Sequence, residues 1–598
     1  MSQASIRDHA LLSDCQSAAL ATPRGAIDWW PAPRFDDPSA FSALLDDSSG
    51  HWTICPDEPF DASRRYRPGT LVLETTMRAA GGTLRLTDAL ALGAGARGHE
   101  IGHEVPHALA RHVEVLDGEL TICMRCVPKL EYGLAVPEFT REAGAVATIG
   151  GPERLFLRGD EIEIDGSSAR ARLRLRAGQD AGWILHRAAG SYAQAPPRLD
   201  VRETLDDTST AWRSWSQQHA GYNGLQGDRV RCASLVFQGL TYQPTGALVA
   251  APTTSLPEVP GGDSNWDYRY GWLRDAAMTV RALSVCACSD ESLRYFDWMV
   301  RAGVTCRAEE QVQIVFGVHG ERDLSEHRLE HLAGHRGARP VRVGNAAWRQ
   351  KQLDVLGHVL DSAWVIRDEL GTPDEFTARF LRQLADRAEQ QWREDDSSIW
   401  EGREGERHYV VSKVGCWVAL DRAVRLADRL GARGECARWA AARDELHRTV
   451  LREGFDARRG AFTGAFGSDH LDAGVLLLAL MGFVEPDDPR MTSTIAVLED
   501  ELADGGLMRR WTGAKDGAFL PASFWLAECH ARAGRIDRAH EVFEQAAGAA
   551  NDLGLLAEEV DLTSGEPLGN FPQAISHVGL VNAALALTEA ESRQGTPA

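Results

Sequence analysis

The 598-residue chain lacks the segments that would place it in or across a membrane. It contains no run of about 18 uncharged apolar residues, the length that a helix needs to span a bilayer. Its first ten residues also lack the basic start and apolar stretch of a secretory signal. We therefore expect no membrane partner and a cytoplasmic location.

Positive charge is also scarce. The chain has 64 Lys and Arg against 86 Asp and Glu, which gives a formal net charge of -22. Such a balance repels the phosphates of nucleic acids and of anionic membrane surfaces. We therefore expect no nucleic acid partner.

Paired cysteine motifs are few. Eleven cysteines, an odd number, are scattered from Cys15 to Cys529, which is typical of reduced thiols in a cytoplasm. Cys123 and Cys126 form a C-x-x-C, but no second such pair completes a zinc site. They lie in an alternating pattern, so we interpret them as ordinary strand residues.

Two motifs in the first half lack the structural context that their chemistry requires. The run Gly93–Gly98 matches the dinucleotide pattern G-x-G-x-x-G, but a Gly and a Pro soon interrupt the helix that should follow. The run His99-Glu-Ile-Gly-His103 matches the zinc-peptidase pattern H-E-x-x-H, with His107 beyond it. The same breaks oppose a helix that would align both histidines. We interpret this run as a solvated loop, with adventitious metal binding as the minor alternative, and expect no cofactor and no resident metal.

The first third of the chain predicts a β-domain. Short alternating runs separated by Gly, Asp and Pro turns are typical of strands, and their succession without helices favours an antiparallel β-sandwich. We place this N-terminal domain at residues 1–202. The alternating runs are 71–77, 82–88, 112–116, 154–157, 161–164 and 169–176.

The remainder predicts a helical domain. Residues 203–226 read as a linker helix, and helical periodicity then fills residues 227–598. About twelve helices suit an (α/α)6 toroid, and no fixed-period repeat supports a helical solenoid instead. The segments are 227–241, 273–287, 290–303, 349–369, 374–393, 411–430, 434–451, 472–482, 490–503, 518–534, 536–549 and 575–592.

One inter-helix loop has the composition of a sugar-binding site. The run Asn265–Asp275 packs two Trp and two Tyr around Arg274 and Asp275. Aromatic faces stack on the CH faces of a pyranose, while an Arg/Asp pair binds its hydroxyls. An ion pair at a helix start with core aromatics is the alternative. We favour sugar binding because the aromatics cluster before the apolar helix begins.

Two further loops offer polar candidates. Glu401 follows Trp400, whose ring can shield the carboxyl from water and keep it protonated as a general acid. An exposed Glu at a loop end is the alternative. Arg342 and Asn345 lie at the entry to another helix and are candidates for binding hydroxyls, or otherwise mark only a helix start.

A carboxylate cluster near the C-terminus supplies the candidate base. Glu558, Glu559 and Asp561 follow an apolar pair and precede a loop broken by Gly and Pro. Acids among apolar residues at a helix mouth have shifted pKa values, as a general base requires. A solvated acidic cluster is the alternative, and the choice depends on a second carboxylate elsewhere.

Together these runs resemble glycoside hydrolase family 15, the glucoamylase and trehalase group. The N-terminal run Gly25–Pro38 looks like the β-domain that precedes the catalytic domain in bacterial trehalase-like members. The resemblance thus covers nearly the whole chain and implies a sandwich followed by a toroid. The matching runs are 265–275, 340–347, 400–401 with 412–413, and 556–579.

The resemblance assigns roles residue by residue. It implies that Glu401 is the general acid and Glu558 the general base, with Glu559 as the competing base. Two departures lie near Arg510, where Trp511 replaces the usual Tyr and Asp516 replaces a longer acid, which puts that loop's part in substrate selection in doubt. The implied substrate-binding residues are Tyr268, Trp272, Arg274, Asp275, Arg342, Trp400, Arg510 and Glu559.

The resemblance also implies an inverting exo-hydrolase that releases β-glucose from a small sugar substrate. A water would attack between two carboxylates that stand about 6.5–9.5 Å apart. Trehalose is favoured by the trehalase-like N-terminal domain, and malto- or isomalto-oligosaccharides are the alternative. A non-catalytic carbohydrate-binding protein would need a missing carboxylate, and both are present. The sequence does not fix the oligomeric state, and a homo-oligomer is compatible with it.

Overall fold

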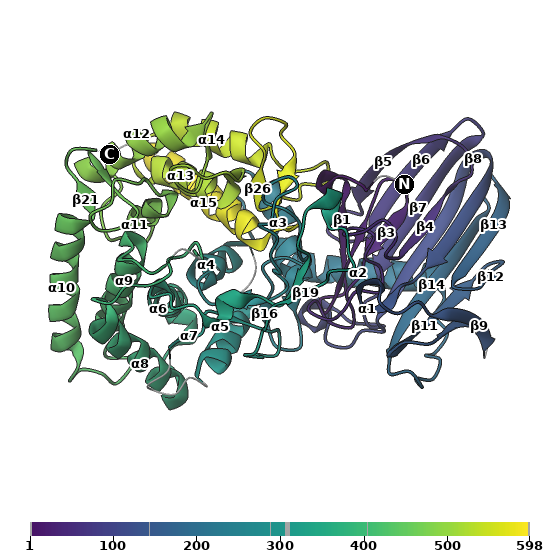
Figure 1. Ribbon diagram of the computed structural model, residues 1–598, viewed down its shortest axis with the longest axis horizontal. Coiled ribbons are helices and arrows are strands. Elements are labelled where there is room, and N and C mark those ends of the chain that lie inside the picture. The colour runs from purple at the N-terminus through teal and green to yellow at the C-terminus, as the bar shows by residue number, and fades with distance from the viewer. Residues whose placement is uncertain are drawn as a thin grey trace.

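The computed structural model describes residues 3–142, 144–219, 221–286, 289–304, 311–402 and 405–595. A β-rich domain lies at one end and a ring of helices at the other (Figure 1). The predicted order of an antiparallel sandwich followed by a helical toroid is confirmed. Among the described helices, none is long and apolar enough to cross a membrane.

The β-domain consists of two antiparallel sheets that share strand β8, Ala108–Val127. One sheet has the order β1-β2-β3-β4-β8-β13-β12 and the other β5-β6-β7-β8-β14-β11-β10-β9. The other strands are β1 Ala10–Ser13, β2 Ala18–Ala21, β3 Ala26–Trp29, β4 His51–Pro56, β5 Phe60–Tyr66, β6 Leu73–Ala79, β7 Gly82–Leu90, β9 Glu138–Glu142, β10 Ala145–Ile149, β11 Glu153–Gly159, β12 Glu163–Asp165, β13 Ser168–Arg176 and β14 Asp180–Ala189.

Strand β8 joins the two sheets because each half pairs with different neighbours. Residues 108–118 pair with β7 and β14, whereas residues 119–127 pair with β4 and β13. Alternate residues of both halves face the sandwich core, which also contains the fully buried Trp30, Trp52 and Trp183. Cys123 and Cys126 lie on β8, as the alternating pattern predicted.

Helix α2, Val201–Gln218, connects the two domains. Asp200 caps it by accepting a hydrogen bond from the backbone N–H of Glu203. One face packs on β7, β8 and β14 and buries Trp212 and Trp215. The linker helix is therefore anchored on the sandwich.

Twelve helical segments of the described chain, the short α11 among them, form two concentric sets. Each inner helix packs on the next until α15 packs on α4, which closes the ring. The inner set is α4 Ala276–Cys286, α6 Asp354–Val365, α9 Val410–Leu426, α11 Leu477–Leu480 with the preceding turn Ala473–Leu476, α13 Leu520–Arg532 and α15 Ala574–Gly595. The outer set is α3 Gly227–Leu240, α5 Ser289–Val304, α8 Glu375–Gln391, α10 Cys436–Glu453, α12 Pro489–Leu502 and α14 Ile536–Ala547.

The two sets differ in how their sequences are buried. Inner helices such as α9 and α13 are buried on nearly all sides. Outer helices such as α8 and α10 have one buried face and one exposed face. Trp272, Arg274 and Asp275 directly precede α4, whereas Glu401 and Glu558 lie on the longer loops that lead into α9 and α15. The ring therefore gathers the loops at one end.

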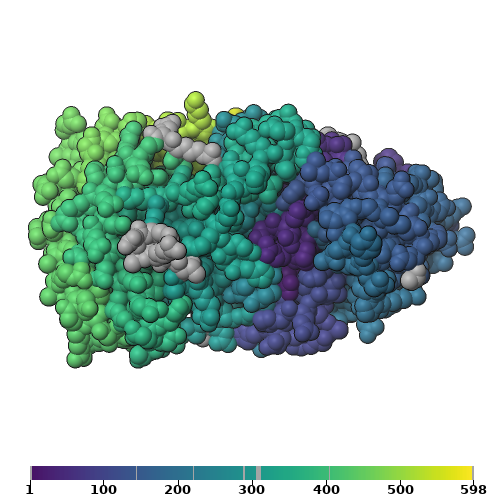
Figure 2. Space-filling view, turned by 60° about the horizontal axis from the view of Figure 1, so that its bottom comes forward, coloured from purple at the N-terminus to yellow at the C-terminus, as the bar shows by residue number. Residues whose placement is uncertain are grey.

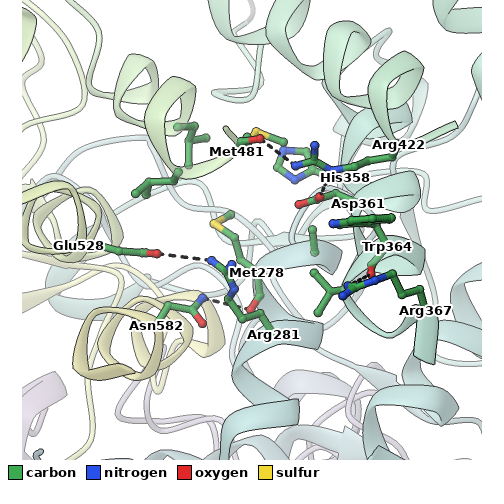
Figure 3. A pocket seen from close by; sticks show the side chains of 14 residues that line it. Met278, Arg281, His358, Asp361, Trp364, Arg367, Arg422, Met481, Glu528 and Asn582 are labelled. Carbon is green, nitrogen blue, oxygen red and sulfur yellow. Dashed lines mark hydrogen bonds and ion pairs between the residues drawn. The ribbon is translucent and has the colours of Figure 1, made fainter. Parts of the chain in front are cut away.

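A cavity of about 230 Å³ lies inside the ring, lined by residues of all six inner helices (Figure 3). Met278, His358, Arg422 and Glu528 are among its lining residues, and several of these lie well inside their helices. Neither Glu401 nor Glu558 lines it. The cavity is therefore separate from the candidate catalytic groups.

The sandwich braces the loop that leads into α4. The N-terminal segment, purple in Figure 2, lies between the teal atoms of the toroid and the blue atoms of the sandwich, and Leu11, Leu20 and Trp29 pack in one core with toroid residues. The Trp29 indole donates to the carbonyl of Pro252 at 2.8 Å. Arg269, fully buried, pairs with Asp267 at 2.7 Å and donates to the Tyr132 hydroxyl at 2.8 Å. The N-terminal domain thus fixes the run that carries the aromatic candidates.

Candidate active site

The loop before α4 holds the carboxylate of Glu401. The Trp272 indole N–H donates to its Oε1 at 2.7 Å, and Arg274 Nη1 donates to the same oxygen at 3.0 Å. The Glu401 side chain retains 20% exposure. Gln350 binds the backbone carbonyl of Glu401 at 3.0 Å. The carboxyl is thus fixed on one side and open on the other.

Arg274 links three segments of this region. Besides Glu401, its Nη1 donates to the carbonyl of Ile399 at 2.7 Å and to Gln352 at 3.3 Å. Its Nε lies 3.4 Å from Asp275. Burial raises the pKa of Asp275, and the guanidinium of Arg274 opposes that shift. The ion pair that the alternative interpretation expected is therefore present, and it adjoins the candidate acid.

Trp400 forms an aromatic wall rather than holding the Glu401 carboxyl. Its ring packs on Trp511 at 5.7 Å and on Phe519 at 5.4 Å between centroids. Its indole N–H donates to Asp472 at 2.8 Å, and burial raises the pKa of Asp472 to about 6. The expected shielding of Glu401 by Trp400 is thus replaced by direct contacts from Trp272 and Arg274.

The backbone also aims Glu401. Its φ is +57°, in the left-handed region that side chains other than Gly adopt at a cost of about 1–3 kcal/mol. Such strain persists only where surrounding contacts fix the conformation. Here the contacts of Arg274 and Gln350 hold the turn.

Glu558 is buried, and two donors reach one of its oxygens. Tyr268 donates its hydroxyl to Oε1 at 3.0 Å, and Arg510 Nη2 donates to the same atom at 3.0 Å. Oε2 has no hydrogen-bond partner within the described part of the chain. Burial, with a smaller repulsion from Glu258, raises the pKa of Glu558 to about 8. Glu558 therefore combines a raised pKa with a buried oxygen that has no hydrogen-bond partner among the described residues.

Arg510 is the centre of the base region. Its guanidinium pairs with Glu258 at 3.1 Å, Asp516 at 2.9 Å, Glu558 at 3.0 Å and Glu559 at 2.7 Å. One positive charge thus faces four carboxylates, and burial with the neighbouring acids raises the pKa values of Glu558 and Glu559. Three of these acids lie close enough together to share a cation, and Arg510 already supplies that charge.

Glu559 and Asp561 differ from Glu558 in what they contact. Glu559 is fully buried, where it accepts the Gly517 N–H at 2.9 Å and pairs with Arg510. Asp561 accepts the backbone N–H groups of the two residues that follow Leu562 and so closes a turn. These contacts favour Glu558 as the base and make Glu559 a positioning residue.

Arg342 is committed to protein groups. Its guanidinium pairs with Glu326 at 3.0 Å and donates to the carbonyls of Asp263 and Asn265, each at 2.8 Å. It also stacks on the Trp266 ring at 4.6 Å. This differs from the hydroxyl-binding role expected from the sequence. The arginine supports the aromatic loop instead.

Tyr268 and Trp272 connect the two halves of the site. Their rings meet edge to face with centroids 5.5 Å apart, while each donates to a different carboxylate. The loop before α4 therefore positions Glu401 and Glu558 together.

Three polar residues of this region are absent from the candidates that the sequence offers, and a fourth, Asp516, appears there only as a departure from the family pattern. Glu258 and Asp516 bind Arg510, Gln352 binds Arg274, and Asp472 binds Trp400. Each stands shortly before an inner helix or on a loop that folds back over the ring. What these residues share is their position at the same end of the toroid. A local sequence pattern does not contain this information.

Comparison with known proteins gives two family matches that together cover most of the chain. Residues 230–585 match the model of glycosyl hydrolases family 15, and residues 1–212 match a trehalase-like N-terminal model. A trehalase of Mycobacterium tuberculosis (strain ATCC 25618 / H37Rv) is 36% identical, with 98% of this chain and 90% of that protein covered. A trehalase of Thermoplasma volcanium is 32% identical over 98% of this chain and 94% of that protein.

Among solved structures, a bacterial glucoamylase complexed with acarbose has the same fold. It superposes with a TM-score of 0.75 at 13% identity, over 100% of this chain and 97% of that one. At this identity the match bears on architecture alone. It extends over both the sandwich and the toroid.

Proposed function

The chain belongs to glycosyl hydrolases family 15 and is a glycoside hydrolase, and from this premise we propose that it hydrolyses trehalose with inversion of configuration. Relatives named trehalase in bacteria and archaea align with nearly the whole chain, the N-terminal domain included. The observation that carries the mechanism is Glu558, a buried carboxylate with one oxygen held by Tyr268 and Arg510 and the other without a hydrogen-bond partner among the described residues.

Glu401 is the proposed general acid. It would give its proton to the glycosidic oxygen as the bond to C1 breaks. Trp272 and Arg274 hold Oε1, which leaves the remaining oxygen of the carboxyl to carry and deliver the proton. The left-handed backbone at Glu401 and its partial exposure support a side chain directed at the open part of the site.

Glu558 is the proposed general base. Its Oε2 would take a proton from a water that attacks C1 on the face opposite Glu401. The raised pKa makes its carboxylate a strong base once it is ionised. Inversion requires room for this water, and we expect the two carboxyl groups to stand about 6.5–9.5 Å apart.

The remaining candidates are proposed to bind the terminal glucose. Asp275 and Arg274 would bind its hydroxyls, and the rings of Tyr268, Trp272 and Trp400 would contact its CH faces. Asp275 and Arg274 stand at the first turn of an inner helix, so a sugar bound to them lies at the ring entrance. This arrangement supports cleavage from a chain end.

Malto- and isomalto-oligosaccharides are the competing substrates, because the fold is shared with a glucoamylase. The match of residues 1–212 to a trehalase-like N-terminal model and the relatives named trehalase favour trehalose. We also propose that the chain consists of an N-terminal domain of residues 1–202, a linker of residues 203–226 and a catalytic domain of residues 227–598. We further propose a cytoplasmic location, which the free thiols of the nine described cysteines support.

The test incubates the chain with trehalose, maltose, isomaltose and soluble starch and follows each glucose anomer by NMR. Inversion of trehalose should release α- and β-glucose in equal initial amounts, because the leaving glucose keeps its α configuration. Initial release of α-glucose alone would contradict the inverting mechanism. Faster release from maltose or starch than from trehalose would contradict the proposed substrate.

A further inference from the structure

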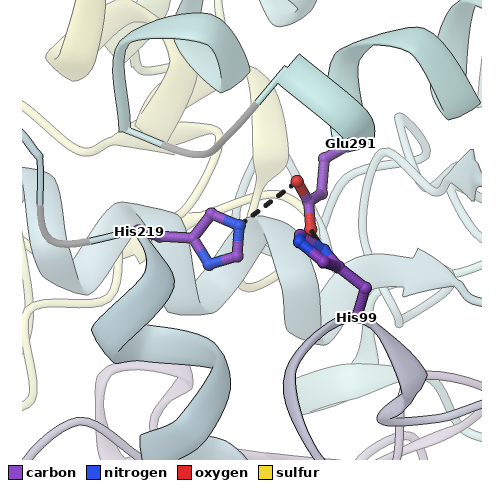
Figure 4. A group of neighbouring side chains, drawn as sticks. All are labelled: His99, His219 and Glu291. Atoms are coloured by element: carbon purple, nitrogen blue, oxygen red, sulfur yellow. Dashed lines mark hydrogen bonds and ion pairs between the residues drawn. The ribbon is translucent and has the colours of Figure 1, made fainter.

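Three potential metal ligands from separate parts of the chain converge at the domain junction (Figure 4). His99 lies on the loop between β7 and β8, His219 directly follows α2, and Glu291 lies in the first turn of α5. His99 Nδ1 is 2.7 Å from Glu291 Oε1, and His219 Nε2 is 3.2 Å from Glu291 Oε2. The sandwich, the linker helix and the toroid therefore each contribute one group.

The hydrogen bond at the other nitrogen of His219 fixes its tautomer. Nδ1 lies 2.6 Å from the backbone carbonyl of Trp215, which can only accept, so Nδ1 carries the proton. In the neutral ring, Nε2 then presents its lone pair to the Glu291 carboxylate. Two acceptors at 3.2 Å require a cation between them, either a proton or a metal ion.

We propose that His99, His219 and Glu291 bind one divalent cation of the zinc class. Their ligand atoms all lie within 4.8 Å of one another. Bonds of about 2.0–2.2 Å around a tetrahedral zinc separate neighbouring ligand atoms by about 3.4 Å, so small side-chain rotations suffice. Two imidazoles and one carboxylate suit zinc, cobalt or nickel, whereas calcium and magnesium prefer oxygen ligands alone.

Neighbouring groups orient these ligands as the outer partners of a metal site do. Trp215 acts on two of them, because its carbonyl accepts from His219 and its indole N–H donates to Glu291 Oε1 at 3.3 Å. Asp290 lies 3.7 Å from Nε2 of His99, on the side of the ring away from the proposed ion. The side chain of His219 is 1% exposed and that of His99 is 32% exposed, which leaves an entry path and a water-facing fourth position.

The site would act as a clasp between the domains and is separate from the catalytic groups. The proposed site uses only one of the two histidines of the H-E-x-x-H run. His103, the second histidine of that motif, has its Nε2 3.2 Å from the Arg294 guanidinium, whose charge repels a cation. His99 is instead joined to His219, 120 residues along the chain, and to Glu291.

The experiment uses the full chain after removal of metal with a chelator. Calorimetric titration with zinc should give one equivalent bound, and titration with cobalt should give the intense visible absorption of a tetrahedral site. His219→Ala and Glu291→Gln should each weaken zinc binding by at least about 100-fold, since even outer partners contribute 10–100-fold. His103→Ala, on the same loop, is the matched control and should bind as the parent does.

Stability gives the second readout. Zinc should raise the melting temperature of the parent and of His103→Ala, but not that of His219→Ala. If His219→Ala does not fold, His99→Ala on the partly exposed loop takes its place. Absence of stoichiometric zinc binding would mean that protons alone join the three groups and would overturn the proposal. Unchanged zinc affinity in the His219 or His99 variant would overturn it as well.

Discussion

Around Glu401, an indole and a guanidinium donate to one oxygen, whereas around Glu558 a single guanidinium serves four carboxylates. The first arrangement fixes the position of a carboxyl that keeps some exposure. The second is fully buried and cannot hold all its acids ionised at once. Direct hydrogen-bond donors therefore fix the position of the Glu401 carboxyl. The charge of the Glu558 carboxyl depends instead on its neighbours Glu258, Asp516 and Glu559.

Removal of either proposed catalytic carboxyl should have the largest effect. Glu401→Gln and Glu558→Gln should each lower kcat on the natural substrate by about 10²–10⁴-fold or more, because each removes a proton transfer in the transition state. Steady-state kinetics with trehalose measures the loss. Glu559→Gln is the matched control for the adjacent acid. If Glu559→Gln is inactive while Glu558→Gln keeps its activity, the base assignment is wrong.

Loss of the Arg510 guanidinium should have the second-largest effect. Arg510→Met leaves four carboxylates without their shared positive charge, and removing one partner of a buried ion pair costs about 3–5 kcal/mol. Chemical denaturation should show a fall in the free energy of unfolding of that order, with loss of activity. Arg509→Met, next to it along the chain, is the control. Equal stability of the two variants would contradict the shared-charge account.

A change in pH dependence should separate the base region from the acid region. Burial and the Glu258 charge both raise the pKa of Glu558, so Glu258→Gln should lower that pKa. The base then ionises at lower pH, and the acidic limb of the kcat/KM profile moves towards lower pH. Asp561→Asn, which alters a turn two residues further on from Glu559, should leave the limb in place. A limb that moves to higher pH in Glu258→Gln would contradict the prediction.

The smallest expected effect is a change in how folding stability depends on pH when Glu558 is replaced. The folded-state pKa of Glu558, about 8, lies above its ordinary value of 4.5, so the native protein holds a proton that the unfolded chain loses as the pH rises through this window. Folding stability therefore falls with increasing pH between these values. Glu558→Gln removes this contribution, so its melting temperature relative to that of the parent should rise from pH 5 to pH 8. Thermal melts at both pH values measure it.

Glu401→Gln is the control for that melt series. This variant removes the carboxyl that is paired with Arg274 at 3.0 Å and keeps 20% exposure, so it shows what the loss of a partly exposed ion pair does to the melt. If both variants gain melting temperature as the pH rises, the melts would not distinguish the region around Glu558 from the region around Glu401.

Much of this architecture could be predicted because its signals are periodic. The strands of residues 71–90 and 163–176 alternate, and all twelve predicted helices of the second domain occur. The resemblance to the family predicts Glu401 as the acid and Glu558 as the base. In the structure Trp272 donates to Glu401 and Tyr268 to Glu558, while the two roles stay predictions.

The missed features depend on contacts between distant segments. Glu258 meets Arg510 across 252 positions, and His99 meets His219 across 120, so no local pattern carries them. Arg342 was assigned to hydroxyl binding because a loop arginine looks the same in sequence whether it faces a ligand or a carbonyl. Only the fold distinguishes the two.

The most direct test of the acid and base roles uses α-D-glucosyl fluoride beside trehalose. Fluoride leaves without being protonated, so a variant that lacks only the general acid should keep activity on it. Glu401→Gln should therefore hydrolyse the fluoride at a rate near that of the parent while failing on trehalose, and Glu558→Gln should fail on both. Rapid hydrolysis of the fluoride by Glu558→Gln, with failure of Glu401→Gln, would reverse the two roles and contradict the account.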